Sequence, residues 1–221
     1  MPSPPVTLAD LRKEAEQALA QVADGPDLDP ASAALIAFAV RTSVTCLDGD
    51  EVQAHIRKAL DAGATGAQVH EVMALVSGLG VHTLMQGSRC LADALKERGD
   101  ASMSAPLDDA RANLRAQRVG NDPYWDNLER EFPGFLDALL RLSPTTYEAF
   151  FDYCALPWAS RAVRAVTKEL ISVAVDASPT HRFRPGFRLH LGNALALGAG
   201  RKAVLQALDI AAAAPEHRGT T

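Results

Sequence analysis

Apolar residues recur at spacings of three and four along most of this chain, and no stretch alternates apolar and polar residues between turn signals. Spacings of three and four are typical of an amphipathic α-helix, whereas alternation of apolar and polar residues would indicate a half-buried β-strand. The periodic stretches are separated by capping residues, glycines and prolines: Thr7, Gly25-Pro26, Asp29-Pro30, Leu47-Asp48-Gly49, Asp50, Gly63, Thr65 with Gln68, and Gly78-Leu79-Gly80. The pattern predicts an all-α fold, with a first helix from Thr7 to Gly25 and with Asp50 as the cap of the helix that carries His55.

One part of this pattern occurs twice in the chain. Residues 34–46 align with residues 169–181, and residues 55–65 align with residues 190–200, at a constant offset of 135 positions and without a gap. Internal similarity of this kind predicts two similar sets of helices. Residue types that both sets keep are expected to form the scaffold, and types that only one keeps are candidates for a site.

The repeat suggests a division of the chain by similarity. We place the first set at residues 1–97, a polar linker at 98–124 and the second set at 125–221. At the same offset His82 meets His217, after which the first set continues for a full helix and the second has only four residues. The second set is therefore truncated. We expect a neighbouring subunit to cover the apolar surface that its missing helix leaves open.

The composition excludes several classes of function. With 221 residues, of which 48% are hydrophobic, the chain can bury a substantial core. Its net charge of −5 and the absence of a run of like charge argue against a nucleic-acid surface. No stretch has the length of a membrane span without a charge or a helix breaker, and the first residues do not resemble a secretory signal, so a cytoplasmic protein is expected. The three cysteines are far apart and form no Cys-x-x-Cys, so free thiols are expected.

The strongest candidates for chemistry are an acid and a histidine in the second set. Glu169 lies on an apolar helix face, and its counterpart in the first set is Ala34, so the scaffold itself requires no acid there. A buried carboxylate needs a partner. His190 lies on an apolar stripe, and a carboxylate beside it would fix its tautomer and raise its basicity. The counterpart of His190 is His55, so packing is an alternative role for the histidine, and pairing with Lys168 or an arginine is an alternative for the acid.

Between these two residues lies HRFRPGFRLH, the densest basic stretch of an acidic protein. Pro185 suits the start of a helix, whose first amides attract anions, and Arg182 and Arg184 precede them. The stretch is therefore a candidate site for the carboxylate of a substrate, together with His181. The alternative is that these arginines are solvated or pair across a subunit boundary. An aromatic cluster at residues 147–158 packs in the core or lines the same pocket, in which case Trp158 contacts the substrate.

Two other kinds of site are weighed against this one. His181, His190 and Glu169 include metal-ligating types, but their spacing is not a known ligand pattern, so no metal and no cofactor are expected. Cys46, the counterpart of His181, could act as a nucleophilic thiol near His55 in a secondary site. A buried, inert cysteine is the simpler interpretation.

Several of these segments resemble one known family. They are ELISVAVDASPTH and PGFRLHLGNALALGAG in the second set, and ALIAFAV and HIRKALDAGATGAQVHEVMALVSGLGVHTL in the first. Together, in order and twice, they are similar to the carboxymuconolactone decarboxylase family, which includes alkylhydroperoxidase D, in its tandem two-copy form. The resemblance covers most of residues 28–217.

The resemblance implies an all-helical, alkylhydroperoxidase D-like fold in ring-like oligomers, which are hexamers for single-copy chains and homotrimers for a two-copy chain. It also implies a decarboxylase of a carboxylated lactone in the catabolism of aromatic compounds, with the family's glutamate and histidine at Glu169 and His190. The redox branch uses Cys-x-x-Cys-x-x-x-His. Its cysteine positions correspond to Phe183 and Gly186 here, so the thiol pair is absent.

The leading hypothesis is a cofactor-free enzyme for a small carboxylated or lactone-containing molecule. In a decarboxylation, Arg182 or Arg184 would hold a carboxylate, and His190, oriented by Glu169, would deliver the proton that replaces carbon dioxide. Isomerisation and lactone opening stay open. Two alternatives come from other classes: a peroxidase-like thiol redox protein that uses Cys46, and a non-catalytic binding or assembly protein.

Overall fold

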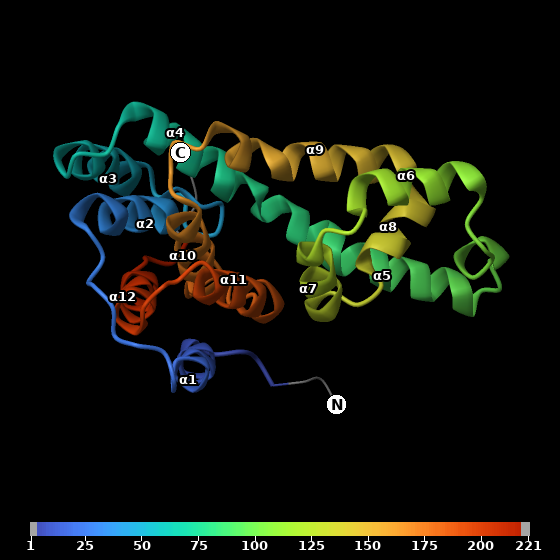
Figure 1. Ribbon diagram of the computed structural model, residues 1–221, viewed down its shortest axis with the longest axis horizontal. Helices are drawn as coiled ribbons and strands as arrows, with labels where there is room; N and C mark the ends of the chain where they lie inside the picture. The colour runs from blue at the N-terminus through green and yellow to red at the C-terminus, as the bar shows by residue number, and fades with distance from the viewer. Residues whose placement is uncertain (1–3, 218–221) are drawn as a thin grey trace. The chain divides into compact units, whose positions relative to one another are not determined.

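The computed structural model describes residues 4–217, and every regular element in that range is a helix (Figure 1). The elements are α1 (Leu8–Ala18), α2 (Pro30–Thr42), α3 (Gly49–Asp61), α4 (Gly66–Ser77), η1 (Gly78–Gly80), α5 (Val81–Glu97), η2 (Ala101–Met103), α6 (Asp109–Val119), α7 (Pro123–Glu131), α8 (Phe135–Leu142), α9 (Pro144–Ser160), α10 (Ala165–Ala177), α11 (Arg184–Ala196) and α12 (Arg201–Ala212). The predicted all-α class is confirmed. No helix in the described range is both long enough and apolar enough to cross a bilayer.

The chain forms two compact units. The larger one combines residues 1–77 with 157–221, as far as these are described, and the smaller one consists of residues 78–156. These units group the chain by packing. The predicted division into 1–97, 98–124 and 125–221 groups it by similarity and stays a prediction.

Most helices begin at the capping residues that the sequence offers. Thr7 and Asp10 form a capping box at the start of α1, in which each side chain accepts the backbone N–H of the other residue. Thr65 and Gln68 exchange the same two bonds at the start of α4, at 2.8 and 3.2 Å. The side chain of Asp29 caps α2. These bonds satisfy N–H groups that have no partner within their own helix.

The predicted cap of α3 was wrong by two positions. The side chain of Asp48, not that of Asp50, accepts the backbone N–H of Glu51, at 3.2 Å. Asp50 lies inside the first turn, where its charge favours the helix start through the dipole. An aspartate at either position is typical of a helix N-terminus, and the helix begins after the earlier one.

The predicted end of α1 was also wrong, because the helix stops at Ala18 rather than near Gly25. The carbonyl groups of Ala23 and Asp24 accept the N–H groups of the first two residues of α12, each at 3.0 Å. This segment thereby accepts hydrogen bonds from N–H groups at the start of α12 that have no partner within their own helix. Such a partner lies far away in the sequence and leaves no local signal.

The core of the larger unit forms around α10, which packs against α11, α12, α2 and α4. Ten of its thirteen residues are buried, including Leu170, Ile171 and Val173. Three of the ten carry a charge: Lys168, Glu169 and Asp176. Burial of a charged group is unfavourable unless it is paired, so the surroundings of these three residues are the first place to look for a functional site in this unit.

The larger unit contains two series of helices with equal lengths. Helices α10, α11 and α12 begin and end 135 positions after α2, α3 and α4, respectively. Hydrogen bonds join residues at the same offset: Ser32 Oγ lies 3.3 Å from Thr167 Oγ1, and Thr180 Oγ1 donates to the carbonyl oxygen of Thr45. Equivalent residues that meet each other are typical of a two-fold contact.

The smaller unit has a core of its own, built by α5, α8 and η2 around Ala92, Met103 and Ala138. Aromatic rings pack edge to face in a second cluster, which includes Phe135 with Phe150 at 5.2 Å between centroids. Most of the aromatic stretch at 147–158 therefore serves packing. The polar segment predicted as a linker contains η2, α6 and the start of α7.

Candidate functional site

Glu169 and His190 face each other across the contact between α10 and α11. Glu169 Oε2 lies 2.7 Å from Nδ1 of His190, and Asn193 Nδ2 donates to Oε1 of the same carboxylate at 3.4 Å. The Glu169 side chain is only 4% exposed, whereas that of His190 is 19% exposed. No residue within 4–217 is hydrogen-bonded to Nε2 of His190. The pair thus consists of a buried acid and an imidazole whose second nitrogen, Nε2, is available to a substrate.

The electrostatics of this pair favour the protonated ring. Burial opposes the charge on His190, but the charge of Glu169, its hydrogen bond and the charge of Asp176 outweigh burial. The pKa of His190 is therefore raised above its usual value. A histidine of this kind holds a proton at neutral pH more readily than a free one.

The alternative partner of Glu169 is engaged elsewhere. Lys168 Nζ lies 2.5 Å from Oε1 of Glu71 on α4 and donates to the carbonyl oxygen of Pro157 at 2.6 Å. It also lies 5.1 Å from the centre of the Trp158 ring, within the range of a cation–π interaction. Lys168 therefore does not neutralise Glu169. The structure places Trp158, a predicted substrate contact, against this buried lysine.

Glu71 itself is part of the support for α10. Its carboxylate accepts the N–H of Ala162 at 2.7 Å and that of Val163 at 3.3 Å, and it binds the hydroxyl of Ser160. Ser160 is the last residue of α9, and Ala162 and Val163 lie in the turn between α9 and α10. The buried carboxylate of Glu71, which binds one cation and several hydrogen-bond donors, therefore stabilises the segment that leads into α10, the helix that carries Glu169.

Sequence reasoning missed a second carboxylate on α10. Asp176 follows Glu169 by seven residues, two helical turns, so both acids lie on nearly the same face. It is 2% exposed, and its Oδ1 lies 3.4 Å from Nε2 of His181. The predicted substrate contact His181 is therefore backed by a buried acid, as His190 is. The signal was present in the sequence as an acid two turns after Glu169 on the same apolar helix.

In the basic stretch at residues 181–190, one arginine is exposed to solvent and two arginines pair with an acid on α1. Arg184 Nε lies 3.0 Å from a carboxylate oxygen of Glu14, and Arg188 Nε lies 2.8 Å from the other. Arg182 is exposed and has a positive φ of 46°. Pro185 occupies the second position of α11, one later than the position that the sequence suggested. The predicted use of Arg182 and Arg184 in substrate binding stays a prediction, and Arg184 already holds a carboxylate of this chain.

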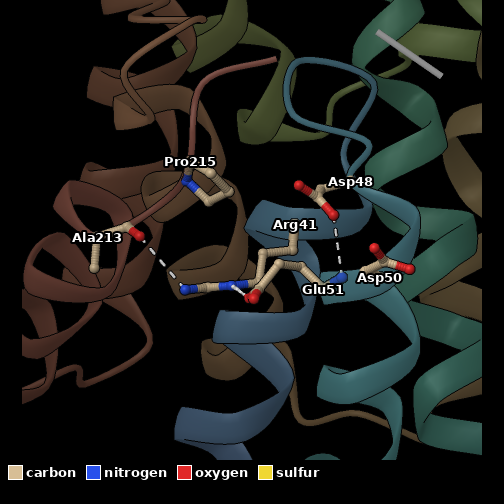
Figure 2. Close-up of a pocket in the computed structure, with 6 residues that line it drawn as sticks. All are labelled: Arg41, Asp48, Asp50, Glu51, Ala213 and Pro215. Carbon is tan, nitrogen blue, oxygen red and sulfur yellow. Dashed lines mark hydrogen bonds and ion pairs between the residues drawn. The ribbon is translucent and has the colours of Figure 1, made fainter. Parts of the chain in front are cut away.

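The helices α2 and α3 form the other candidate region, beside a polar cavity of about 390 Å³ (Figure 2). Arg41 and Glu51 meet at its centre, with 2.9 Å between Nε and Oε2, and Arg41 also donates to the carbonyl oxygen of Ala213 at 3.4 Å. The remaining lining residues are Asp48, Asp50 and Pro215. Within residues 4–217, Arg41 is the only arginine of the lining, and its guanidinium is bound to an acid of the same lining.

Cys46 and His55, the residues of the predicted secondary site, belong to this region, and no hydrogen bond joins them. His55 Nε2 lies 3.3 Å from Oε2 of Glu51, and its Nδ1 is buried without a hydrogen bond among the described residues. Burial, with the charges of Arg41 and Lys58, lowers the pKa of His55, although Glu51 opposes this. Cys46 is 1% exposed, and burial raises the pKa of its thiol. A thiol in this state is a poor nucleophile.

Comparison with known proteins gives one informative match. No protein-family model matches the chain, and neither does any curated protein. A solved structure from Burkholderia xenovorans LB400, named provisionally as a gamma-carboxymuconolactone decarboxylase subunit, superposes with a TM-score of 0.73. It is 29% identical, and the match covers 94% of this chain and 91% of that one. The chain therefore has the alkylhydroperoxidase D-like helical fold, and its similarity to a protein of the carboxymuconolactone decarboxylase family extends over almost its whole length.

Proposed function

We propose that the protein is a decarboxylase-like enzyme that acts on a small carboxylated, lactone-containing molecule by acid–base chemistry at His190. The observation that carries this proposal is the contact of 2.7 Å between Nδ1 of His190 and the buried carboxylate of Glu169. A carboxylate that binds one ring nitrogen fixes the tautomer and directs the other nitrogen to the substrate. The name of the similar solved structure supports the same class of substrate.

The chemistry requires no cofactor in this proposal. Loss of carbon dioxide from the substrate leaves an electron pair on carbon, which is delocalised into the neighbouring carbonyl group. His190 then gives its Nε2 proton to that carbon and recovers a proton from solvent. Glu169 stabilises the imidazolium before the transfer, and Asn193 holds the second oxygen of the carboxylate.

We also propose that the chain is a tandem duplication with its working site in the second copy. The equal lengths and offset of α2–α4 and α10–α12 support this, as do the bonds between equivalent residues. In the first copy Ala34 replaces the acid, and the histidine is paired within its own helix. By resemblance to the family, the protein assembles into a ring-like homotrimer.

The test is turnover of gamma-carboxymuconolactone, followed by release of carbon dioxide. Glu169→Gln and His190→Gln should each reduce kcat by about 10²-fold or more, which is the usual contribution of a positioned acid or base. Glu51→Gln and His55→Gln are the matched controls in the other helix pair and should retain activity. Equal losses in both pairs, or turnover that persists without His190, would reject the proposal.

The same experiment separates the two alternatives. A thiol redox protein would lose its peroxide turnover in Cys46→Ser, although the burial of Cys46 argues against this chemistry. A binding or assembly protein would show no turnover and would keep its oligomeric state in Glu169→Gln. Light scattering of the same samples gives that state and tests the proposed trimer.

A further inference from the structure

Asp176 is the buried group that the proposed mechanism does not use. Its Oδ1 lies 3.4 Å from His181, but its Oδ2 is buried and has no hydrogen bond among the described residues. A carboxylate oxygen in this state is unfavourable unless it acts on a nearby positive charge or donor. Something in the surroundings of Asp176 should therefore explain why the acid is kept.

The position of Oδ2 is set by a missing side chain on α11. A methyl group built at Gly186 would overlap Oδ2 of Asp176 and would also lie 2.8 Å from Cδ1 of Phe183. The carboxylate thus fills the space that a side chain at position 186 would take. Only glycine allows α11 to pass so close to this acid.

Residue 186 precedes His190 by four positions, and side chains at this spacing are neighbours on a helix. Oδ2 of Asp176 therefore stands where an i,i+4 partner of His190 would stand. In α3 such a partner exists, because Glu51 precedes His55 by four residues and contacts its Nε2 at 3.3 Å. Asp176 forms no ion pair with His190, and its charge reaches the ring from a longer distance, where it favours the protonated form.

The remaining charged groups around α11 do not offset this arrangement. Helices α10 and α1 pack most closely against α11. From α10, Glu169 contacts the ring and the charge of Asp176 acts on it at longer range. From α1, Glu14 is engaged by Arg184 and Arg188. His181, in the turn before α11, is placed against Asp176. Among the described residues, the charges that act on the imidazole are thus those of two carboxylates, Glu169 in contact and Asp176 at longer range.

We propose that Asp176 is a positioning residue that keeps the proton on Nε2 of His190, so that this histidine works as a general acid. This inference rests on the proposed function and narrows it. An imidazolium that the charges of two carboxylates stabilise is prepared to deliver a proton, as decarboxylation requires. Abstraction of a proton, the first step of an isomerisation, needs the neutral ring instead. The site is therefore built for substrates that lose carbon dioxide and take up a proton.

The first test needs no substrate. The pKa of His190 is measured by NMR titration of its labelled ring in the wild type, in Asp176→Asn and in the surface control Asp209→Asn, whose acid pairs with Arg12. Asp176→Asn keeps the shape of the side chain and removes its charge, so it should lower the pKa of His190. The control should leave that pKa unchanged. Equal values in all three proteins would overturn the proposal, whatever the substrate proves to be.

Gly186→Ala provides a second route to the same displacement. Its methyl group must push the carboxylate of Asp176 away, so the pKa of His190 should fall here too. Adding Asp176→Ala removes the overlap with the carboxylate, and this double variant should regain part of the lost thermal stability while the pKa of His190 stays low. A double variant with the wild-type pKa would show that Asp176 does not act on the ring.

The second test uses turnover of gamma-carboxymuconolactone. If His190 is an acid, kcat falls as the pH rises through the pKa of His190, and Asp176→Asn moves this fall to lower pH. A profile in which kcat rises with pH through that pKa would overturn the acid role. Failure of the proposed function looks different, because turnover would then be absent while the NMR result with Asp176→Asn still stands.

Discussion

The helix pairs α2–α3 and α10–α11 share their lengths and spacing but place their charges in opposite ways. In the first pair the cation, Arg41, comes from the first helix and the acid, Glu51, from the second. In the other pair the acid, Asp176, takes the position equivalent to Arg41, and Gly186 takes the position equivalent to Glu51. The histidine is the same in both. One scaffold therefore holds two imidazoles in two different electrostatic environments.

The consequence appears in the two pKa directions. The pKa of His55 is lowered, with burial as the main cause, while the charge and hydrogen bond of Glu169 overcome burial and raise the pKa of His190. Glu51 is 45% exposed on its side chain and is shared with Arg41, whereas Glu169 is 4% exposed. A buried acid acts on its histidine through a low dielectric. The comparison teaches that the environment of the acid decides what the histidine can do.

The largest effect on stability should come from a charge that only the α10 pair carries. Lys168 occupies the position equivalent to Ala33, and its ion pair with Glu71 is buried. Lys168→Met leaves that carboxylate without its cation, which typically costs about 3–5 kcal/mol. Urea unfolding measures the loss. The double variant Lys168→Met with Glu71→Gln should recover most of it, and a loss below about 1 kcal/mol in the single variant would show that the pair does not support α10.

A smaller effect, of opposite sign in the two pairs, is expected from pH. The pKa of His190 is raised, so its contribution to stability is fully present below its unfolded pKa and is lost as the pH rises through the folded value. The pKa of His55 is lowered, so its contribution is present above its unfolded pKa and is lost as the pH falls through the folded value.

Urea unfolding over a pH series checks this contrast with His190→Gln and His55→Gln. The free energy of unfolding that His190→Gln removes should be greatest at acid pH, and the amount that His55→Gln removes should grow as the pH rises. If the losses in the two variants changed with pH in the same direction, the two histidines would not differ electrostatically, and the comparison would fail.

The sequence predicted the parts of this site that depend on local pattern. Glu169 stands out as an acid on an apolar helix face, and the contact with His190 follows from the neighbouring helix. Asp176 was missed, although its spacing from Glu169 was visible, because nothing local indicates that Gly186 gives it room. Glu71 could not have been found, since it precedes Lys168 by 97 residues and only the fold brings them together.

The smallest effects should be equal in the two pairs and would sharpen the comparison. Gly63 and Gly198 end α3 and α11 with φ of 92° and 89°, and in each case the next residue donates its N–H to the helix at 2.9 Å. Nothing lies within 4 Å of a methyl group built at either glycine, so only the backbone resists a side chain. Gly63→Ala and Gly198→Ala should each lower the free energy of unfolding by about 1 kcal/mol. Unequal losses would mean that the pairs differ in scaffold as well as in charge, whereas equal losses assign their difference to the acids alone.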